Sequence, residues 1–212
     1  MSTGLSIRRT ARRIPRDEKA RITREGLIAA GCKVVAAEGY APATIAKIAD
    51  AAGVAHGTFY NYFEDRQALF EELLPYEGKR MLAAIEKAAI DARPGIAREL
   101  VRFNTFLDYV AESEGFYRVL YEAEVFAPNA HRIHIDTIVS GYRRSLRRGV
   151  EEGHVAELTD AEIDSVIYHL LGMRAYAAMQ IHYEKNPDAR KRIIENSMRI
   201  YDRILRMSLL MK

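Results

Sequence analysis

The chain has 212 residues, of which 49% are hydrophobic and 29% charged, and its net charge is +3. This composition suits one globular domain or two small ones and excludes wholesale disorder. No apolar run approaches the ~18 residues of a membrane span and no signal-peptide core is present, so we expect a cytoplasmic protein. The single thiol, Cys32, excludes an internal disulfide and a thiolate zinc site, and no cofactor is expected.

Basic residues are concentrated at the N-terminus. Residues 1–24 carry eight basic and two acidic side chains, a net charge of +6, so the rest of the chain carries −3. A basic arm on a mildly acidic body favours contact with a polyanion such as nucleic acid. A solvated tail or an Arg-rich targeting peptide would have the same composition.

The spacing of apolar residues predicts an all-α fold. Apolar side chains recur every three or four residues almost throughout, and no strand is expected. Two short helices between longer ones predict a compact N-terminal domain over residues 1–75, and the long segments predict a helical bundle over residues 76–212. Glycine and proline separate the expected helices, which span 17–38, 45–52, 56–62, 66–74, 76–91, 95–112, 115–126, 129–151, 160–184 and 188–210.

Residues 44–70 have the local features of two short helices joined by a tight turn. Thr44 is a suitable N-cap for the first helix, and Gly53 supplies a left-handed exit from it. Phe59 and Phe63 lie four residues apart, so the second helix is expected to bury both. Its other faces carry hydrogen-bonding residues without net charge. This is the helix-turn-helix arrangement, in which the second helix enters the major groove and reads base edges.

The residues of this segment resemble a known family. The pattern T-I-x-x-I-A-x-x-A-G-V-x-x-G-T-F-Y-x-Y-F-x-x-x-x-x-L, from Thr44 to Leu69, is similar to the DNA-binding signature of the TetR family of bacterial transcriptional repressors. Upstream, LIAAGCKVVAAEGYAPAT resembles the first helix of that family and its exit. The resemblance covers residues 20–72, and beyond them only the all-helical layout is similar.

The resemblance implies that this segment contacts double-stranded operator DNA. Helix ends and the basic arm would hold phosphates, whereas the second short helix would face the groove. The phosphate contacts would come from Thr44, Lys47, Tyr62 and Arg66, and from Arg12 and Arg13 of the arm. The groove contacts would come from His56, Thr58, Tyr60 and Asn61, with Gly57 allowing the helix to approach the duplex closely.

The last two expected helices carry long apolar stripes. On 188–210 the stripe consists of Ile194, Met198, Tyr201, Leu205 and Leu209. The resemblance implies that these two helices pack against those of a second copy as a four-helix bundle, which makes a homodimer. The periodicity alone fits an intrachain core equally well.

One charge interrupts the apolar stripe of 160–184. Arg174 lies four residues after Leu170 and three before Ala177, where an unpaired guanidinium would carry a severe desolvation cost. An internal or interfacial ion pair, snorkelling to solvent and an anionic ligand remain open as its partner. Tyr176 and His169 are expected as hydrogen-bonding neighbours.

The aromatic-rich residues 103–126 are expected mainly in the core, with some lining a pocket for an apolar or amphipathic inducer. His131 and His134 are three residues apart, but nothing nearby completes a metal site, so we expect surface imidazoles. The candidate ligand-binding residues are Phe103, Phe106, Tyr121, His169, Arg174 and Tyr176.

Together with these patterns, the resemblance implies a homodimeric repressor that an apolar small molecule releases from its operator. The ligand would favour a dimer whose recognition helices are wrongly spaced for successive major grooves. No catalytic residue is expected, because we find no nucleophile with an adjacent base and no metal cluster. The alternatives are an all-helical enzyme with a vestigial helix-turn-helix and a DNA-binding protein without a ligand.

Overall fold

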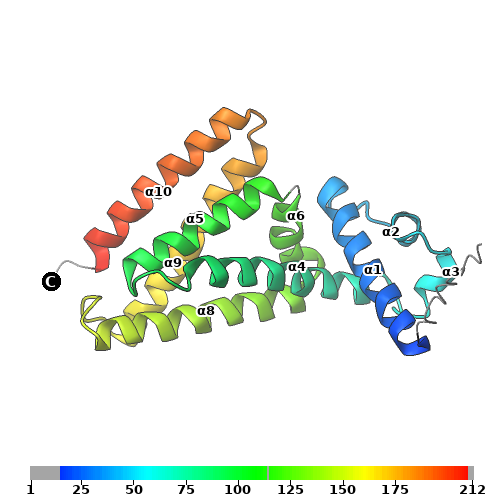
Figure 1. Ribbon diagram of the computed structural model, residues 1–212, viewed down its shortest axis with the longest axis horizontal. Coiled ribbons are helices and arrows are strands. Elements are labelled where there is room, and N and C mark those ends of the chain that lie inside the picture. Colours follow the sequence, from blue (N-terminus) through cyan, green and yellow to red (C-terminus); the bar gives the residue numbers. More distant parts are fainter. Residues whose placement is uncertain (1–14, 114, 210–212) are drawn as a thin grey trace, which may run out of the picture.

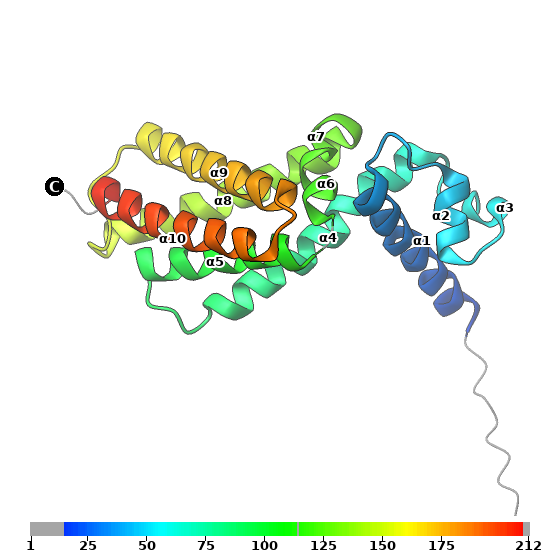
Figure 2. The ribbon, with the colours of Figure 1, turned by 90° about the horizontal axis from the view of Figure 1, so that it is seen from above.

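The computed structural model describes residues 15–113 and 115–209, and all regular structure in these residues is helical (Figure 1). The all-α prediction is confirmed. We call residues 15–75 the head and residues 76–209 the body, and the two lie at opposite ends of the molecule (Figure 2). The helices are α1 (Arg16–Glu38), α2 (Ile45–Ala52), α3 (His56–Phe59), α4 (Arg66–Ala89), α5 (Ile96–Glu112), α6 (Phe116–Tyr121), α7 (Ala123–Phe126), α8 (Pro128–Glu151), α9 (Asp160–Tyr183) and α10 (Pro187–Leu209).

The turn between α2 and α3 forms as its sequence predicts. The Thr44 hydroxyl accepts a hydrogen bond from the Lys47 N–H at 3.3 Å and so caps α2. Gly53 ends α2 with φ 68°, a conformation that a side chain would disfavour. Phe59 and Phe63 are buried in the core of the head. The prediction of a helix over 56–62 is wrong at its end, because α3 stops at Phe59 and the chain continues in turns.

Helix α4 joins the head to the body, and the prediction of two helices separated at Pro75 is wrong. α4 continues through Pro75, which lies on the exposed side of the helix, where the freed carbonyl can meet water. Leu74 before the proline and Gly78 after it are buried, so packing on both sides keeps the helix intact. α4 packs on α1 and also on α5 and α8.

The second joint between head and body lies between the end of α1 and α6. Tyr40 donates its hydroxyl hydrogen to the Val119 carbonyl at 3.1 Å and its N–H to Glu122 Oε2 at 3.0 Å. Gly115 lies directly against Ala36 with φ 75°, and a Cβ at this position would come within 2.3 Å of the Ala36 carbonyl oxygen. Both the backbone conformation and the close approach therefore require glycine at 115.

The apolar stripe of α10 is part of the core of the same chain. Tyr201, Leu205 and Leu209 are at most 4% exposed without any partner chain, so these three residues are not a free dimer surface. A different face of α10 exposes Ile200, Ile204 and Met207. In the part of the chain that is described, no helix is both long and apolar enough to cross a bilayer.

Candidate DNA interface and buried polar centre

The end of the head presents an uncharged hydrogen-bonding surface. His56, Gly57, Tyr60 and Asn61 are exposed, and Thr58 is half-buried. Phe59 points inward from the same short helix and anchors it in the core. A Cβ at Gly57 would contact nothing within 4 Å, so packing inside the protein does not require glycine there. The groove-facing residues that the sequence predicts thus lie together on one accessible surface.

The candidate phosphate contacts have structural roles as well. Thr44 and Lys47 are exposed at the start of α2, and the Lys47 ammonium pairs with Glu38. Arg66 donates to the carbonyls of Ala41 and Ala43 at 3.2 and 3.4 Å, so it also holds the connection between α1 and α2. Tyr62 is half-buried and packs against the core. Arg12 and Arg13 lie outside the described residues.

A buried polar centre, made of Glu99, Tyr142, Arg174 and Tyr201, joins four helices of the body. Glu99 Oε1 on α5 accepts hydrogen bonds from the Tyr142 hydroxyl on α8 at 2.7 Å and the Tyr201 hydroxyl on α10 at 2.6 Å. Arg174 Nη2 on α9 donates to the same oxygen at 2.7 Å. The partner of Arg174 is therefore an internal carboxylate, one of the alternatives that the sequence leaves open.

Aromatic rings surround the guanidinium of this centre. Arg174 Cζ lies 5.4 Å from the ring centroid of Phe103 and 5.5 Å from that of Phe106. Burial by itself would lower the pKa of Arg174, but Tyr142 and Glu99 outweigh it and the pKa is raised, so the guanidinium stays charged. Burial raises the pKa of both Tyr142 and Tyr201, which keeps the two phenols protonated and able to donate.

The structure brings together only some of the predicted ligand-binding residues. Phe103, Phe106 and Arg174 meet at the polar centre, and Tyr121 is half-buried on α6. His169 and Tyr176 are exposed on another face of α9, and the His169 ring bonds the carbonyl of its own helix at Ser165. The prediction that these two residues neighbour Arg174 is wrong, because residues five and two positions away on a helix point to other faces.

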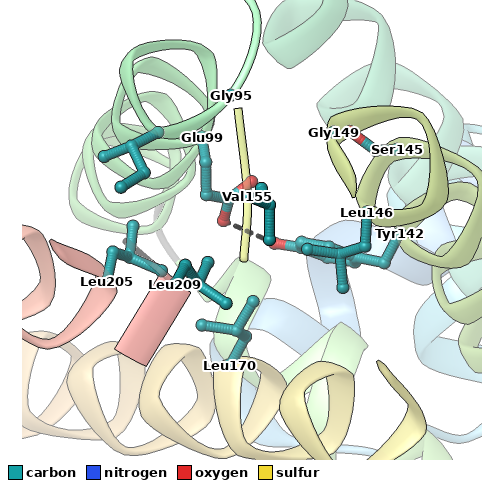
Figure 3. Close-up of a pocket in the computed structure, with 11 residues that line it drawn as sticks. Gly95, Glu99, Tyr142, Ser145, Leu146, Gly149, Val155, Leu170, Leu205 and Leu209 are labelled. Carbon is teal, nitrogen blue, oxygen red and sulfur yellow. Dashed lines mark hydrogen bonds between the residues drawn. The ribbon is translucent and has the colours of Figure 1, made fainter. Parts of the chain in front are cut away.

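A small cavity of about 40 Å³ lies beside the polar centre (Figure 3). Glu99 and Tyr142 form part of its wall, and the dashed line in Figure 3 marks their hydrogen bond. The exposed Ser145 and the glycines Gly95 and Gly149 also line it. Apolar side chains from α5, α8, α9, α10 and the connection between α8 and α9 form most of the remaining wall. These are Ile96, Leu146, Val155, Leu170, Leu205 and Leu209.

Sequence reasoning missed Glu99 and Tyr142, although a signal for Glu99 is present. Glu99 follows Ile96 by three residues and precedes Phe103 by four, so it interrupts the apolar stripe of α5 as Arg174 interrupts that of α9. Two opposite charges on two buried stripes favour an ion pair between them. No comparable pattern distinguishes Tyr142, which lies among the basic residues of α8.

His134 is the other buried polar side chain of the body, and the expectation of a surface imidazole is wrong for it. It is 7% exposed and packs on Gly78 of α4, where glycine leaves room for the ring. Its Nε2 atom is buried without a hydrogen-bond partner among the described residues. Burial, with a smaller contribution from His131, lowers the pKa of His134 to about 4, so the ring is neutral at pH 7.

The comparisons with known proteins agree with this geometry. Residues 27–73, which contain the helix-turn-helix, match the family described as bacterial regulatory proteins, tetR family. The resemblance of the helix-turn-helix segment to the TetR family is confirmed over these residues. It also has the fold of a TetR-family transcriptional regulator from Pectobacterium atrosepticum, with a TM-score of 0.70 and 22% identity over 93% of this chain and 99% of that one. The head therefore matches the DNA-binding domain of that family, and the chain as a whole has the fold of one of its solved members.

Two further relatives carry more specific names. FadR from Bacillus subtilis, solved in complex with stearoyl-CoA, has a TM-score of 0.70 and 17% identity over 85% of this chain and 96% of its own. The transcriptional activator FasR from Mycolicibacterium smegmatis is 26% identical over 114 residues, which are 54% of this chain. The chain spans about half the length of that relative, and the structural likeness shows the fold alone.

Proposed function

We propose that this protein is a homodimeric TetR-family repressor whose hold on its operator is weakened by an apolar or amphipathic small molecule bound in the body. The observation that carries the DNA-binding part is the accessible, uncharged surface of His56, Gly57, Thr58, Tyr60 and Asn61 at the end of the head. Hydroxyl, amide and imidazole groups suit the donors and acceptors of the major groove. Residues 1–75 would bind DNA, and residues 76–212 would sense the ligand and dimerise.

The outer faces of α9 and α10 support the dimer. Six of the eleven exposed large hydrophobic side chains among the described residues are on these two helices, which pack against each other. Large apolar side chains gathered on exposed helix faces are typical of an interface. These side chains are Tyr168, Tyr176 and Tyr183 on α9 and Ile200, Ile204 and Met207 on α10. Tyr176 is accordingly reassigned from the ligand to the dimer.

The ligand part is supported by the polar centre, where one charged pair holds four helices of the body together. A ligand that disturbed this centre would move helices on which α4, and through it the head, is packed. The stearoyl-CoA complex of FadR from B. subtilis shows that a protein of this fold can take a ligand with a long apolar chain.

Selection from a randomised duplex pool tests the DNA-binding part. A pseudo-palindromic sequence is expected, because a twofold dimer places its two recognition helices in successive major grooves. Failure to enrich any sequence would contradict operator binding. Transcription in vitro from a template that carries the selected site then tests whether the protein represses or activates. The protein is expected to reduce transcript, and an increase would make it an activator.

Addition of stearoyl-CoA or 1-octanol to the protein–operator complex tests the ligand part. At least one of these probes is expected to weaken operator binding. If neither changes the affinity, the alternative of a DNA-binding protein without a ligand is favoured. Hydrolysis or transfer chemistry on either probe would instead favour the enzyme alternative.

A further inference from the structure

The polar centre leaves hydrogen-bond acceptor capacity unused at the wall of the cavity. Glu99 Oε1 already accepts three hydrogen bonds, and the Tyr142 hydroxyl hydrogen is committed to it. Among the described residues, Glu99 Oε2 accepts none. An ionised carboxylate has about four lone-pair sites on its two oxygens, so Glu99 retains capacity to accept from a donor placed in the cavity.

The charges at the cavity restrict what such a donor can be. Glu99 and Arg174 neutralise each other at 2.7 Å and are both nearly buried. A cationic ligand would compete with Arg174 for the carboxylate and leave a buried positive charge in excess, and an anionic ligand would meet the like charge of Glu99. Both arrangements require an uncompensated charge out of water, which is costly. An uncharged donor can use Oε2 without breaking the ion pair.

The remainder of the wall determines the rest of the ligand. Apart from the exposed Ser145, the remaining side chains are leucine, isoleucine and valine, which offer no hydrogen bonds and so favour an apolar group next to the donor. We propose that this cavity binds the hydroxyl-bearing end of an uncharged, otherwise apolar molecule, and that Glu99 accepts the hydroxyl hydrogen. This inference rests on the proposed ligand response and names the chemical class of the ligand.

The size of the cavity limits how much of a ligand it can hold. A volume of about 40 Å³ holds a hydroxyl group and a few carbons, since one water needs ~10–15 Å³ by this measure. A longer chain would extend beyond this volume, one side of which is formed by Leu205 and Leu209 in the last turns of α10. This end of α10 is held by the Ala156 N–H, which donates to the Leu209 carbonyl at 2.7 Å from the connection between α8 and α9.

Binding of four probes of matched length tests the proposal on the full chain without DNA. The probes are 1-octanol, octanoate, octylamine and heptyl methyl ether, and the methyl NMR signals of Leu170 and Val155 report occupancy of the cavity. We expect saturable shifts with 1-octanol and at least about tenfold weaker binding of the other three. The ether is the decisive comparison, because it is apolar and neutral but has no hydrogen to donate. Equal or tighter binding of any of the three, or no binding of 1-octanol, overturns the proposal.

Two variants locate the binding. Leu170→Phe fills the cavity and is expected to abolish the response of Val155 to 1-octanol. Leu171→Phe, at a half-buried position next in the chain but outside the cavity wall, is the matched control and is expected to keep it. If Leu170→Phe fails to fold, Val155→Ala enlarges the same cavity and is expected to tighten binding. Whichever of these two cavity variants folds is the one that decides. If its affinity for 1-octanol equals that of wild type, the ligand binds elsewhere and the proposal is overturned.

Operator binding is measured separately, so the two proposals can fail independently. If 1-octanol binds in the cavity but leaves operator affinity unchanged, the site stands and the ligand-controlled repressor fails. If octanoate or octylamine controls operator binding and 1-octanol does not, the repressor stands and the present inference fails.

Discussion

The head and the body both place polar side chains beside aromatic rings, but they orient them in opposite ways. In the head, Phe59 points inward and its neighbours Tyr60 and Asn61 point to solvent without charge. In the body, Glu99 and Arg174 point inward, and Tyr142 and Tyr201 donate to the same carboxylate oxygen. These polar groups of the head are free to meet a partner, whereas the four side chains of the polar centre are already bonded to one another.

This difference separates two physical tasks. Hydrogen-bonding groups that face water lose little when they exchange water for a base edge, so the head can bind DNA without rearranging. A buried ion pair is costly to separate, so the packing of α5, α8, α9 and α10 depends on the polar centre remaining intact. The first arrangement suits recognition, and the second suits a body whose helices move together.

The largest expected effect comes from removing one partner of the buried pair. Arg174→Met keeps the length and the apolar stem of the side chain but leaves the Glu99 carboxyl buried without its cationic partner. We expect a loss of about 3–5 kcal/mol in the free energy of unfolding. Urea unfolding at one fixed protein concentration measures it, because dimerisation makes apparent stability depend on concentration.

The double variant Glu99→Gln with Arg174→Met removes both charges and is expected to recover part of that loss. Arg147→Met is the matched control, since Arg147 pairs with Asp160 on the surface at 2.9 Å and its loss is expected to change stability little. An Arg174→Met protein as stable as wild type would mean that the pair does not hold the four helices together.

The second buried polar side chain, His134, is expected to make the body sensitive to acid. Its pKa is about 4 in the folded chain and 6.5 ordinarily, so between these pH values the unfolded chain binds a proton that the folded chain excludes. Its contribution is therefore fully present above pH 6.5 and is lost as the pH falls towards 4. Over this range wild type should lose about 3 kcal/mol more than His134→Gln. His169→Gln, at an exposed histidine, should follow wild type, and parallel curves for wild type and His134→Gln would contradict the assignment.

A region is better predicted from the sequence when its contacts join residues that are close together in the chain. In the head, the cap at Thr44, the exit at Gly53 and the buried Phe59 all depend on residues within a few positions, and all are confirmed. In the polar centre, Glu99 is 43 residues from Tyr142, 75 from Arg174 and 102 from Tyr201. Periodicity shows that Arg174 is buried but contains no information on which helix supplies its partner.

Residues whose local sequence pattern fits two different structures are the hardest to assign. The α10 stripe with Tyr201 and Leu205 has the pattern of an interface and of a core, and only the packing of α10 on α5 and α9 distinguishes them. Pro75 has the local signature of a helix end, but the buried residues on both sides of it override that preference. In both cases tertiary packing decides between two readings that are equally good locally.

The smallest expected effects concern the surface of the head, where they test whether its polar residues divide into base readers and backbone contacts. Thr58→Ala and His56→Ala are expected to change which operator bases are preferred, since a direct base contact is worth about 1–3 kcal/mol of discrimination. Tyr62→Phe is expected to weaken the binding free energy by about 1 kcal/mol on every DNA sequence alike. Its half-buried ring stays in place, and only a hydrogen bond to the DNA phosphate backbone is lost. Selection of each variant on the same randomised pool separates the two effects. If Tyr62→Phe changes the selected sequence, or if Thr58→Ala leaves it unaltered, the head reads DNA through a different face from the one assigned to it.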